Sequence, residues 1–124
     1  MKLLLFLLLN LSTFAFKINS LDFNKNIKIG DYGEKEYKII NTTTTPIKYT
    51  LDIENSLNNI NITPKTFIIP EGKTKNFKII VNGIKKGNYT YFLTILEETL
   101  NLNLNTNNAK IKMKYRIEHK YSVD

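Results

Sequence analysis

Apolar and polar residues alternate with a period of two over most of this chain, which is typical of β-strands that bury one face. The stretch from residue 47 to residue 53 shows the pattern best, because its odd-numbered residues are all apolar and its even-numbered residues are all polar or charged. This stretch predicts a strand with one dry face and one wet face. No segment after residue 15 shows a competing helical period.

Six further segments predict strands on the same grounds, and polar or glycine-containing stretches separate them. They cover residues 16–23, 37–41, 60–69, 77–81, 89–95 and 110–123. The first of these strands is expected to resume near Ile27 and Ile29. Pro64 is expected to break the strand over residues 60–69 or to place it at a sheet edge, because proline has no N–H to donate to a ladder.

Two local motifs predict how strands begin and end. The sequence Ile69-Pro70-Glu71-Gly72 fits a type I turn, with proline second and glycine fourth. Tyr89 opens a strand and predicts a tyrosine corner, in which the hydroxyl group bonds to nearby backbone.

Seven short strands with turns at this spacing predict an all-β fold, a two-sheet antiparallel β-sandwich. The expected core consists of apolar residues that share the inward face of each strand. They are Tyr37, Ile39, Tyr49, Leu51, Ile53, Phe77, Ile79, Tyr91, Leu93, Ile95, Met113 and Tyr115.

Residues 1–15 predict a signal peptide, which leaves residues 16–124 as one domain. Lys2 precedes an almost unbroken run of leucine, and Ala15 is a small residue after which cleavage can occur, so Phe16 is the expected mature N-terminus. An uncleaved anchor is the alternative. The run is too short to span a bilayer, which needs about 20 residues. We therefore expect a periplasmic or secreted protein with no stable membrane insertion after signal cleavage.

The composition limits the chemistry that the chain can perform. Cysteine is absent, which removes disulfides, thiol catalysis and thiolate metal sites. The net charge of +7 comes with abundant Lys, Ile and Asn throughout, so it gives only weak evidence for a nucleic-acid or membrane partner. The only histidine, His119, lies on the apolar phase of the last strand. We therefore expect no enzyme activity, no cofactor, no metal and no nucleic-acid partner.

Several segments together resemble a known family. The chain reads P-K-T-F-I-I-P-E-G at residues 64–72, F-K-I-I-V at 77–81 and G-N-Y at 87–89. This series resembles the D–E–F portion of the immunoglobulin-like domain that begins periplasmic pilus-assembly chaperones, the PapD-like family. The last strand, with K-I-K-M-K-Y-R at 110–116, resembles the last strand of that domain. The resemblance implies a single immunoglobulin-like antiparallel β-sandwich of about seven strands that acts as an exported binding domain.

The resemblance also implies a binding mode. In that family two basic residues, one on the first strand and one on the last, clamp the C-terminal carboxylate of a pilus subunit. Apolar residues of the last strand complete the subunit's sandwich by β-strand addition. Lys112, with Lys110 beside it, matches the basic position on the last strand, whereas the first strand carries Asp22 where the family has its basic residue.

The sequence L-N-L-N-L-N at residues 100–105 is a second candidate for partner contact. If the preceding strand continues straight, Leu100, Leu102 and Leu104 point away from the core and offer an apolar row to a partner strand. A bulge near Glu97 would instead reverse the phase and turn these side chains inward.

Two function hypotheses follow. The first is an exported chaperone-like domain that holds a partner protein, a pilin-like or other exported subunit, by β-strand pairing, as in pilus or surface-fibre assembly. The second is a secreted or surface structural or adhesive module that associates with copies of itself. In both, the predicted partner surface joins the cationic residues Lys110, Lys112 and Arg116 with the apolar residues Leu100, Leu102 and Leu104.

Overall fold

The computed structural model describes residues 16–54, 56–100 and 112–124, and these residues contain nine strands and no helix. The strands are β1 (Phe16–Ile18), β2 (Lys25–Ile27), β3 (Tyr32–Asn41), β4 (Ile47–Glu54), β5 (Ile60–Thr63), β6 (Thr66–Ile69), β7 (Thr74–Asn82), β8 (Gly87–Thr99) and β9 (Lys112–Val123). In the described part of the chain, no helix is long and apolar enough to cross a membrane.

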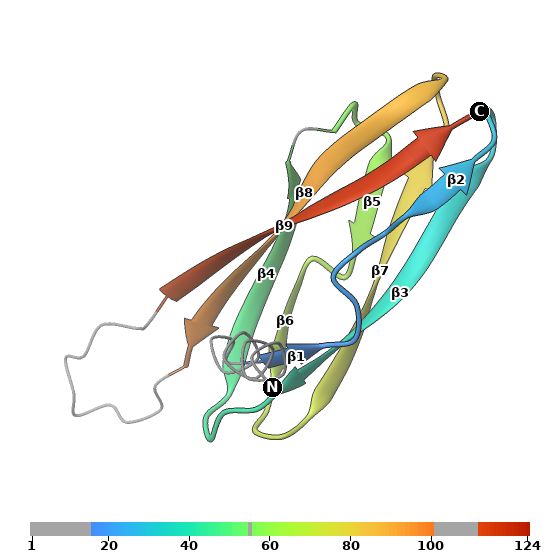
Figure 1. The fold of residues 1–124 in the computed structure, drawn as a ribbon. Helices are drawn as coiled ribbons and strands as arrows, with labels where there is room; N and C mark the ends of the chain where they lie inside the picture. Colours follow the sequence, from blue (N-terminus) through green and yellow to red (C-terminus); the bar gives the residue numbers. More distant parts are fainter. Residues whose placement is uncertain (1–15, 55, 101–111) are drawn as a thin grey trace, which may run out of the picture.

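The strands form two sheets that pack face to face (Figure 1). One sheet has the order β1-β3-β7-β5, and the other has the order β2-β9-β8-β4-β6. All neighbouring strands are antiparallel except β2 and β9, which are parallel. The predicted all-β sandwich is therefore confirmed.

The two extra strands arise because two predicted strands each divide and cross from one sheet to the other. The predicted first strand becomes β1, which pairs with β3, and β2, which pairs with β9 in the opposite sheet. The predicted strand over residues 60–69 divides at Pro64 into β5 and β6, which also lie in different sheets. The expected break at Pro64 is confirmed, since proline cannot donate to a ladder.

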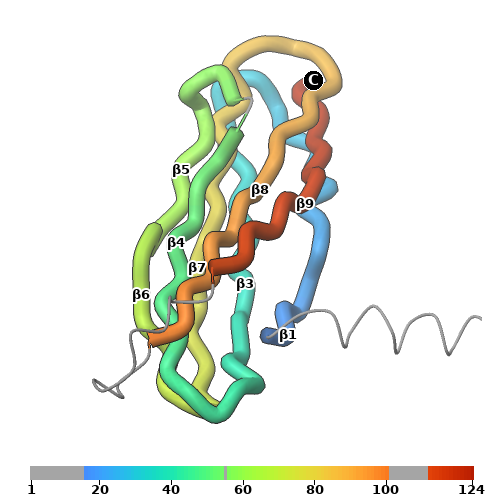
Figure 2. Tube along the Cα trace, turned by 90° about the vertical axis from the view of Figure 1, so that its left-hand side faces the viewer, coloured from blue at the N-terminus to red at the C-terminus, as the bar shows by residue number. Residues whose placement is uncertain are grey.

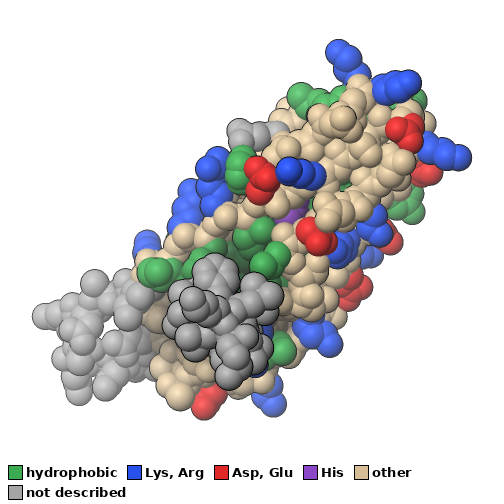
Figure 3. Space-filling view, in the orientation of Figure 1, with side chains coloured by type: hydrophobic (Ala, Val, Ile, Leu, Met, Phe, Trp, Pro, Cys, Tyr) green, Lys and Arg blue, Asp and Glu red, His purple; other side chains and the backbone are tan. Residues whose placement is uncertain are grey.

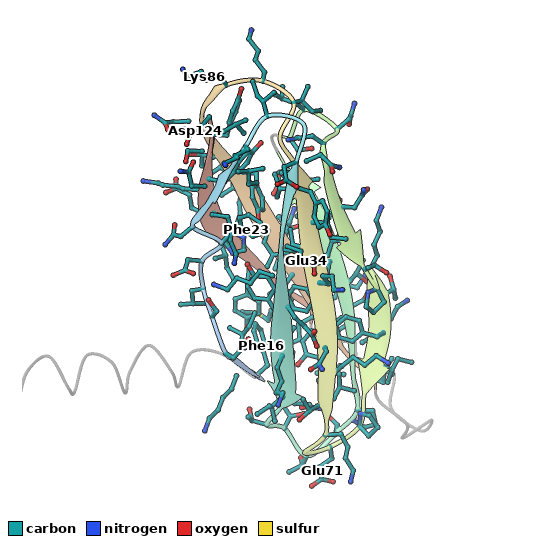
Figure 4. The ribbon with its side chains drawn as sticks, turned by 90° about the vertical axis from the view of Figure 1, so that its right-hand side faces the viewer. Phe16, Phe23, Glu34, Glu71, Lys86 and Asp124 are labelled. Atoms are coloured by element: carbon teal, nitrogen blue, oxygen red, sulfur yellow. The ribbon has the colours of Figure 1, made fainter. Side chains whose placement is uncertain are left out.

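The core lies between the two sheets and consists of the inward-facing residues of all nine strands. Nine of the predicted core residues are buried, and Ile53 and Tyr115 are partly buried against them. The nine are Tyr37, Ile39, Tyr49, Leu51, Phe77, Ile79, Tyr91, Leu93 and Ile95. Phe16 on β1 and Phe23 on the segment between β1 and β2 add two buried rings (Figure 4).

The prediction that Met113 belongs to the core is wrong. Its alternation is as predicted, because it shares a face with Tyr115 and Ile117, but its side chain is 46% exposed. Met113 lies near the start of β9, where β9 pairs with β8 on one side and with no described strand on the other. Alternation predicts the direction of a side chain, but it does not predict whether anything covers that side chain.

The predicted type I turn is shifted by one residue. Lys73 N donates to Pro70 O at 3.1 Å, so the turn runs from Pro70 to Lys73 and places Gly72 third. Gly72 has a φ angle of 69°. A positive φ at the third position defines a type II turn, which favours glycine there.

The predicted tyrosine corner is present. Tyr89 Oη donates to Lys85 O at 2.6 Å, and the Tyr89 ring stacks on Tyr121 with centroids 5.1 Å apart.

Tyr89→Phe is expected to keep this stacking and to lower the free energy of unfolding by about 1 kcal/mol, the net value of one hydrogen bond. Urea denaturation measures the difference. Tyr32→Phe is the matched control, because Tyr32 is 57% exposed and its hydroxyl group should contribute little. Equal changes in the two variants would contradict a specific role for the corner.

Candidate functional site

The outer edge of β9 is the candidate functional site. On one side, β9 pairs with β8 along its whole length, from Lys112 opposite Glu98 to Val123 opposite Gly87. On the other side, it pairs with β2 over only three residues, Tyr121 to Val123. Before that short ladder, no strand among the described residues lies beside β9 on this side, and Figure 2 shows β9 next to β8.

Alternate residues of β9 direct their backbone groups to this edge. Lys120 O accepts a hydrogen bond from Asn24 N at 3.0 Å, and Asp124 N donates to Ile27 O at 2.9 Å, so the even-numbered residues face β2. The pairing of β9 with β8 keeps one register throughout and has no bulge. Because backbone direction alternates along a strand, the even-numbered residues before Lys120 point the same way. We call the outward backbone groups of Lys112, Lys114, Arg116 and Glu118 the β9 edge.

The inner face of β9 beside this edge is apolar. Tyr115 packs edge-on against Phe16, with ring centroids 5.2 Å apart, and Ile117 is partly buried against the core. Met113 is largely exposed at the start of the strand. An apolar row, Met113, Tyr115 and Ile117, therefore lies beside the β9 edge. Tyr115 and Ile117 are partly covered by the core, whereas Met113 is largely exposed.

Two of the predicted cations on the outer face of β9 are engaged in ion pairs. Lys112 Nζ lies 3.6 Å from Glu98 Oε2. Arg116 Nε lies 3.3 Å from Glu54 Oε2, and its guanidinium carbon lies 3.9 Å from the centre of the Phe92 ring. Exposed pairs of this kind contribute little to stability, but they reduce the charge that these side chains offer to a ligand.

The other predicted partner residues fall in two groups. Lys110, Leu102 and Leu104 lie outside the described residues. Leu100 is half-buried, and its backbone N–H donates to Pro46 O at 3.1 Å.

Asp22 does not lie on a strand. It lies in the segment between β1 and β2, where its Oδ1 is 2.7 Å from Lys35 Nζ. The hydrogen bond from Lys35 is the main cause that lowers the pKa of Asp22. The carbonyl oxygen of Asp22 accepts a hydrogen bond from Tyr37 Oη at 2.7 Å. Asp22 therefore anchors the crossing segment to β3.

Sequence reasoning missed a buried carboxyl group beside the site. Glu97, opposite Met113 in the β8–β9 ladder, is 3% exposed, and Tyr49 Oη donates to its Oε2 at 3.4 Å. Burial raises the pKa of Glu97. The signal was present in the sequence, because Glu97 continues the odd-numbered inward phase of Leu93 and Ile95. In residues 16–54, 56–100 and 112–124, no three His, Cys, Asp or Glu residues are grouped so that they could hold a metal ion.

No protein-family model matches the sequence, and no curated protein is similar to it in sequence. Solved structures are similar in fold. The chain superimposes on the ASH/PapD-like domain 7 of human CEP192 with a TM-score of 0.67 at 13% identity, over 89% of this chain and 85% of that one.

Two chaperone structures are also similar. The YadV chaperone gives a TM-score of 0.65 at 14% identity, over 90% of this chain and 53% of that one. The Salmonella enterica SafA pilin in complex with the SafB chaperone gives a TM-score of 0.65 at 12% identity, over 90% and 55%. The chain thus spans about half the length of the chaperone chains that it matches. These likenesses show that the protein has the PapD-like immunoglobulin-like fold, which confirms the resemblance in the sequence at the level of fold.

Proposed function

We propose that the protein is an exported, chaperone-like binding domain that holds a partner protein by pairing a strand of that partner with the β9 edge. The observation that carries the proposal is the open edge itself. Four consecutive even-numbered residues of β9 direct backbone N–H and C=O groups away from β8, with no strand beside them among the described residues. Such an edge is a template for β-strand addition.

The solved structures support this proposal. One similar structure holds a pilin in complex with its chaperone, so the fold is compatible with a protein partner. Export rests on the predicted signal peptide at residues 1–15, which lie outside the described residues.

The side chains around the edge suggest the character of the partner strand. Its inward residues would meet the apolar row that begins at the exposed Met113. Its outward residues would meet Lys112, Lys114 and Arg116. Lys114 forms no ion pair with a described residue, whereas Lys112 and Arg116 pair with Glu98 and Glu54. A partner strand with apolar residues on one face and acidic residues on the other fits both, and a C-terminal carboxylate could take the place of an acidic side chain.

The same edge also fits a second copy of the chain, as in a structural or adhesive module. In an antiparallel pair centred on Arg116, Lys114 of each copy would lie opposite Glu118 of the other, which brings opposite charges together on neighbouring strands. Sedimentation velocity of the purified protein distinguishes the two hypotheses, because only self-pairing makes the protein dimerise without another chain.

A proline at position 114 tests the strand pairing directly. Lys114→Pro removes a backbone N–H that points outward, and proline is tolerated on an edge strand in that orientation. We expect the domain to stay folded and its affinity for the partner or second copy to fall about tenfold, the effect of one lost hydrogen bond near the upper end of the usual range. Lys114→Ala is the matched control, because it removes the same charge but keeps the N–H.

The assay uses the protein that copurifies with the tagged chain from the exported fraction, once it has been identified and purified, or the dimer if no other protein is found. Equal affinities of the proline and alanine variants would contradict the strand-pairing proposal. If the proline variant unfolds, hydrogen exchange of the Lys114, Arg116 and Glu118 amides in the original chain replaces it. Those amides must then become protected when the partner binds.

A further inference from the structure

The end of the sandwich that carries the C-terminus has an unusual surface. Three connections meet there: residues 28–31 between β2 and β3, residues 83–86 between β7 and β8, and residues 56–59 before β5 (Figure 1). We call this surface the loop end. In Figure 4, Lys86 and Asp124 mark it, and Glu71 marks the opposite end.

Large apolar side chains are concentrated at the loop end. Ile29, Tyr32, Leu57 and Ile84 are between 53% and 60% exposed, and they are four of the seven large apolar residues that are exposed in the described part of the chain. Single exposed apolar residues are ordinary on protein surfaces, but a group of them marks a site of interaction. Ile29, Leu57 and Ile84 lie on three separate connections and Tyr32 is the first residue of β3, so the group arises from the fold and not from one apolar run in the sequence.

The backbone holds these side chains in place. Gly30 N donates to Gly83 O at 2.9 Å, and Gly83 N donates to Asp31 O at 2.8 Å, so the two main connections are hydrogen-bonded to each other. They approach so closely that a Cβ atom on Gly83 would lie 2.8 Å from Lys28 O. Asn82 N donates to Asn59 O at 2.9 Å, which ties the third connection to the same end. The apolar groups are therefore presented to solvent by an ordered scaffold, which lowers the entropic cost of binding.

Exposed lysines outnumber the carboxylate side chains at the loop end, three to two. Lys28, Lys85 and Lys86 are exposed, and none of them forms an ion pair with a described residue. The two nearby carboxylates accept hydrogen bonds from their own chain. Asp31 Oδ1 accepts one from Tyr32 N at 2.8 Å, and Asp124 Oδ2 accepts one from Asn26 Nδ2 at 2.9 Å. Figure 3 shows lysine or arginine side chains projecting at this end.

The shape of the surface favours a flat partner. The four apolar side chains extend from the connections and from the first residue of β3 at the tip of the sandwich. None of the four lines either of two surface hollows, of about 500 and 280 Å³, although the smaller hollow includes Ser56 and Asn58 of the third connection. A strand or helix of a partner protein needs a groove or an edge, whereas a bilayer surface accepts separate apolar tips and places lysines among lipid phosphates.

We propose that the loop end docks the domain peripherally on an anionic phospholipid surface, with Ile29, Tyr32 and Ile84 in the interface and Lys28, Lys85 and Lys86 near the phosphate groups. This inference is independent of the proposed partner pairing. The open part of the β9 edge begins at Lys112, at the other end of the strand from Val123, so a docked domain would hold that edge away from the lipid (Figure 1).

A tryptophan reporter tests the docking surface. The chain contains no tryptophan, so Ile84→Trp gives a single emission signal from the loop end of the full chain. Ile68→Trp is the control, since Ile68 is similarly exposed on the side of the sandwich, on β6. With vesicles that contain equal parts of phosphatidylglycerol and phosphatidylcholine, we expect a blue shift and quenching by brominated lipid at position 84 only.

This design separates the loop end from the leucine-rich segment at residues 3–9, which would bind lipid by itself without moving the reporter at position 84 into the bilayer. A response at both positions, or at neither, would overturn the proposal. In the latter case an acidic protein surface becomes the occupant to test. An equal response with pure phosphatidylcholine would also overturn it, because the lysines would then have no role.

A charge comparison completes the test. In the Ile84→Trp chain, replacing both Lys85 and Lys86 with Gln should lower the affinity for the anionic vesicles about thirtyfold, the effect expected for two lysines at an anionic membrane. Replacing Lys73 and Lys75, which lie at or toward the opposite end, changes the net charge equally and should have little effect. Equal losses in the two variants would mean non-specific attraction and would contradict docking through the loop end.

Discussion

Replacing Leu93 with alanine is expected to lower the free energy of unfolding by about 2–5 kcal/mol, the usual cost of removing a leucine side chain from a packed core. Leu93 is fully buried on β8, and its neighbours in the ladders are Ile53 on β4 and Ile117 on β9. A domain of this size has a total stability of about 5–15 kcal/mol, so the variant should be partly or wholly unfolded at 37 °C.

Urea denaturation followed by circular dichroism measures this effect. Leu57→Ala is the matched control, because it makes the same chemical change at a side chain that is 57% exposed. A surface substitution of this kind should change stability by less than about 0.5 kcal/mol. If the two variants lost equal stability, or if the original chain showed mainly helical dichroism, the β-sandwich described above would be refuted.

The second large effect concerns acid, and it arises from a histidine inside the sandwich. His119 is 1% exposed and stacks against Tyr37, with ring centroids 5.8 Å apart. Its Nδ1 lies 2.8 Å from Tyr91 Oη, whereas its Nε2 has no hydrogen-bond partner. A positive charge at this position would have to be buried with one ring nitrogen unsatisfied.

Burial is the main cause that lowers the pKa of His119 to about 4, and the nearby Lys35 lowers it further, while Asp22 opposes them. In the unfolded chain the same group has a pKa of about 6.5. Between these two values the unfolded chain binds the proton and the folded domain does not, so acid favours unfolding. Stability is therefore fully present above pH 6.5 and falls as the pH decreases toward 4, by about 3 kcal/mol in total.

Urea denaturation at one-unit intervals from pH 7 to pH 4 follows this loss. His119→Phe keeps an aromatic ring but cannot titrate, so its stability should change much less across the same interval. Glu97, whose pKa burial raises, contributes in the opposite direction, and Asp22, whose pKa is lowered, loses its contribution near and below 3.8. Both carboxyl groups remain in the variant. An acid response that is equally steep in His119→Phe and in a second variant, His119→Gln, would rule out His119 as its cause.

The strands were predictable because the alternation of apolar and polar residues that indicates a strand lies within the strand's own sequence. The alternation from residue 47 to residue 53 requires only that one face be buried, and the structure buries that face in β4. Pro64 broke its strand for a reason that lies in the residue itself. The crossing of the first strand between the sheets was not predictable, because the pairing of β2 with β9 joins residues almost a hundred positions apart. No local sequence pattern shows which distant strand a segment pairs with.

The candidate site was predictable only in part. Alternation correctly placed Lys112 and Arg116 on the polar face of the last strand. That Arg116 meets Glu54 depends on the register of three neighbouring strands, and alternation does not determine register. How much of the β9 edge is open follows from which strands stand beside it, so that extent became visible only in the assembled sheet.

The parallel ladder between β2 and β9 determines how the domain would carry tension. Phe16 and Asp124 lie at opposite ends of the sandwich (Figure 4), and β2 and β9 run in the same direction. A force that separates the two termini would therefore slide these strands past each other. The hydrogen bonds from Asn24 N, Asp124 N and Ile29 N cross this boundary and would be loaded together, not opened one at a time. β2 and β9 thus form a shear clamp, a geometry that resists a force applied along the sandwich.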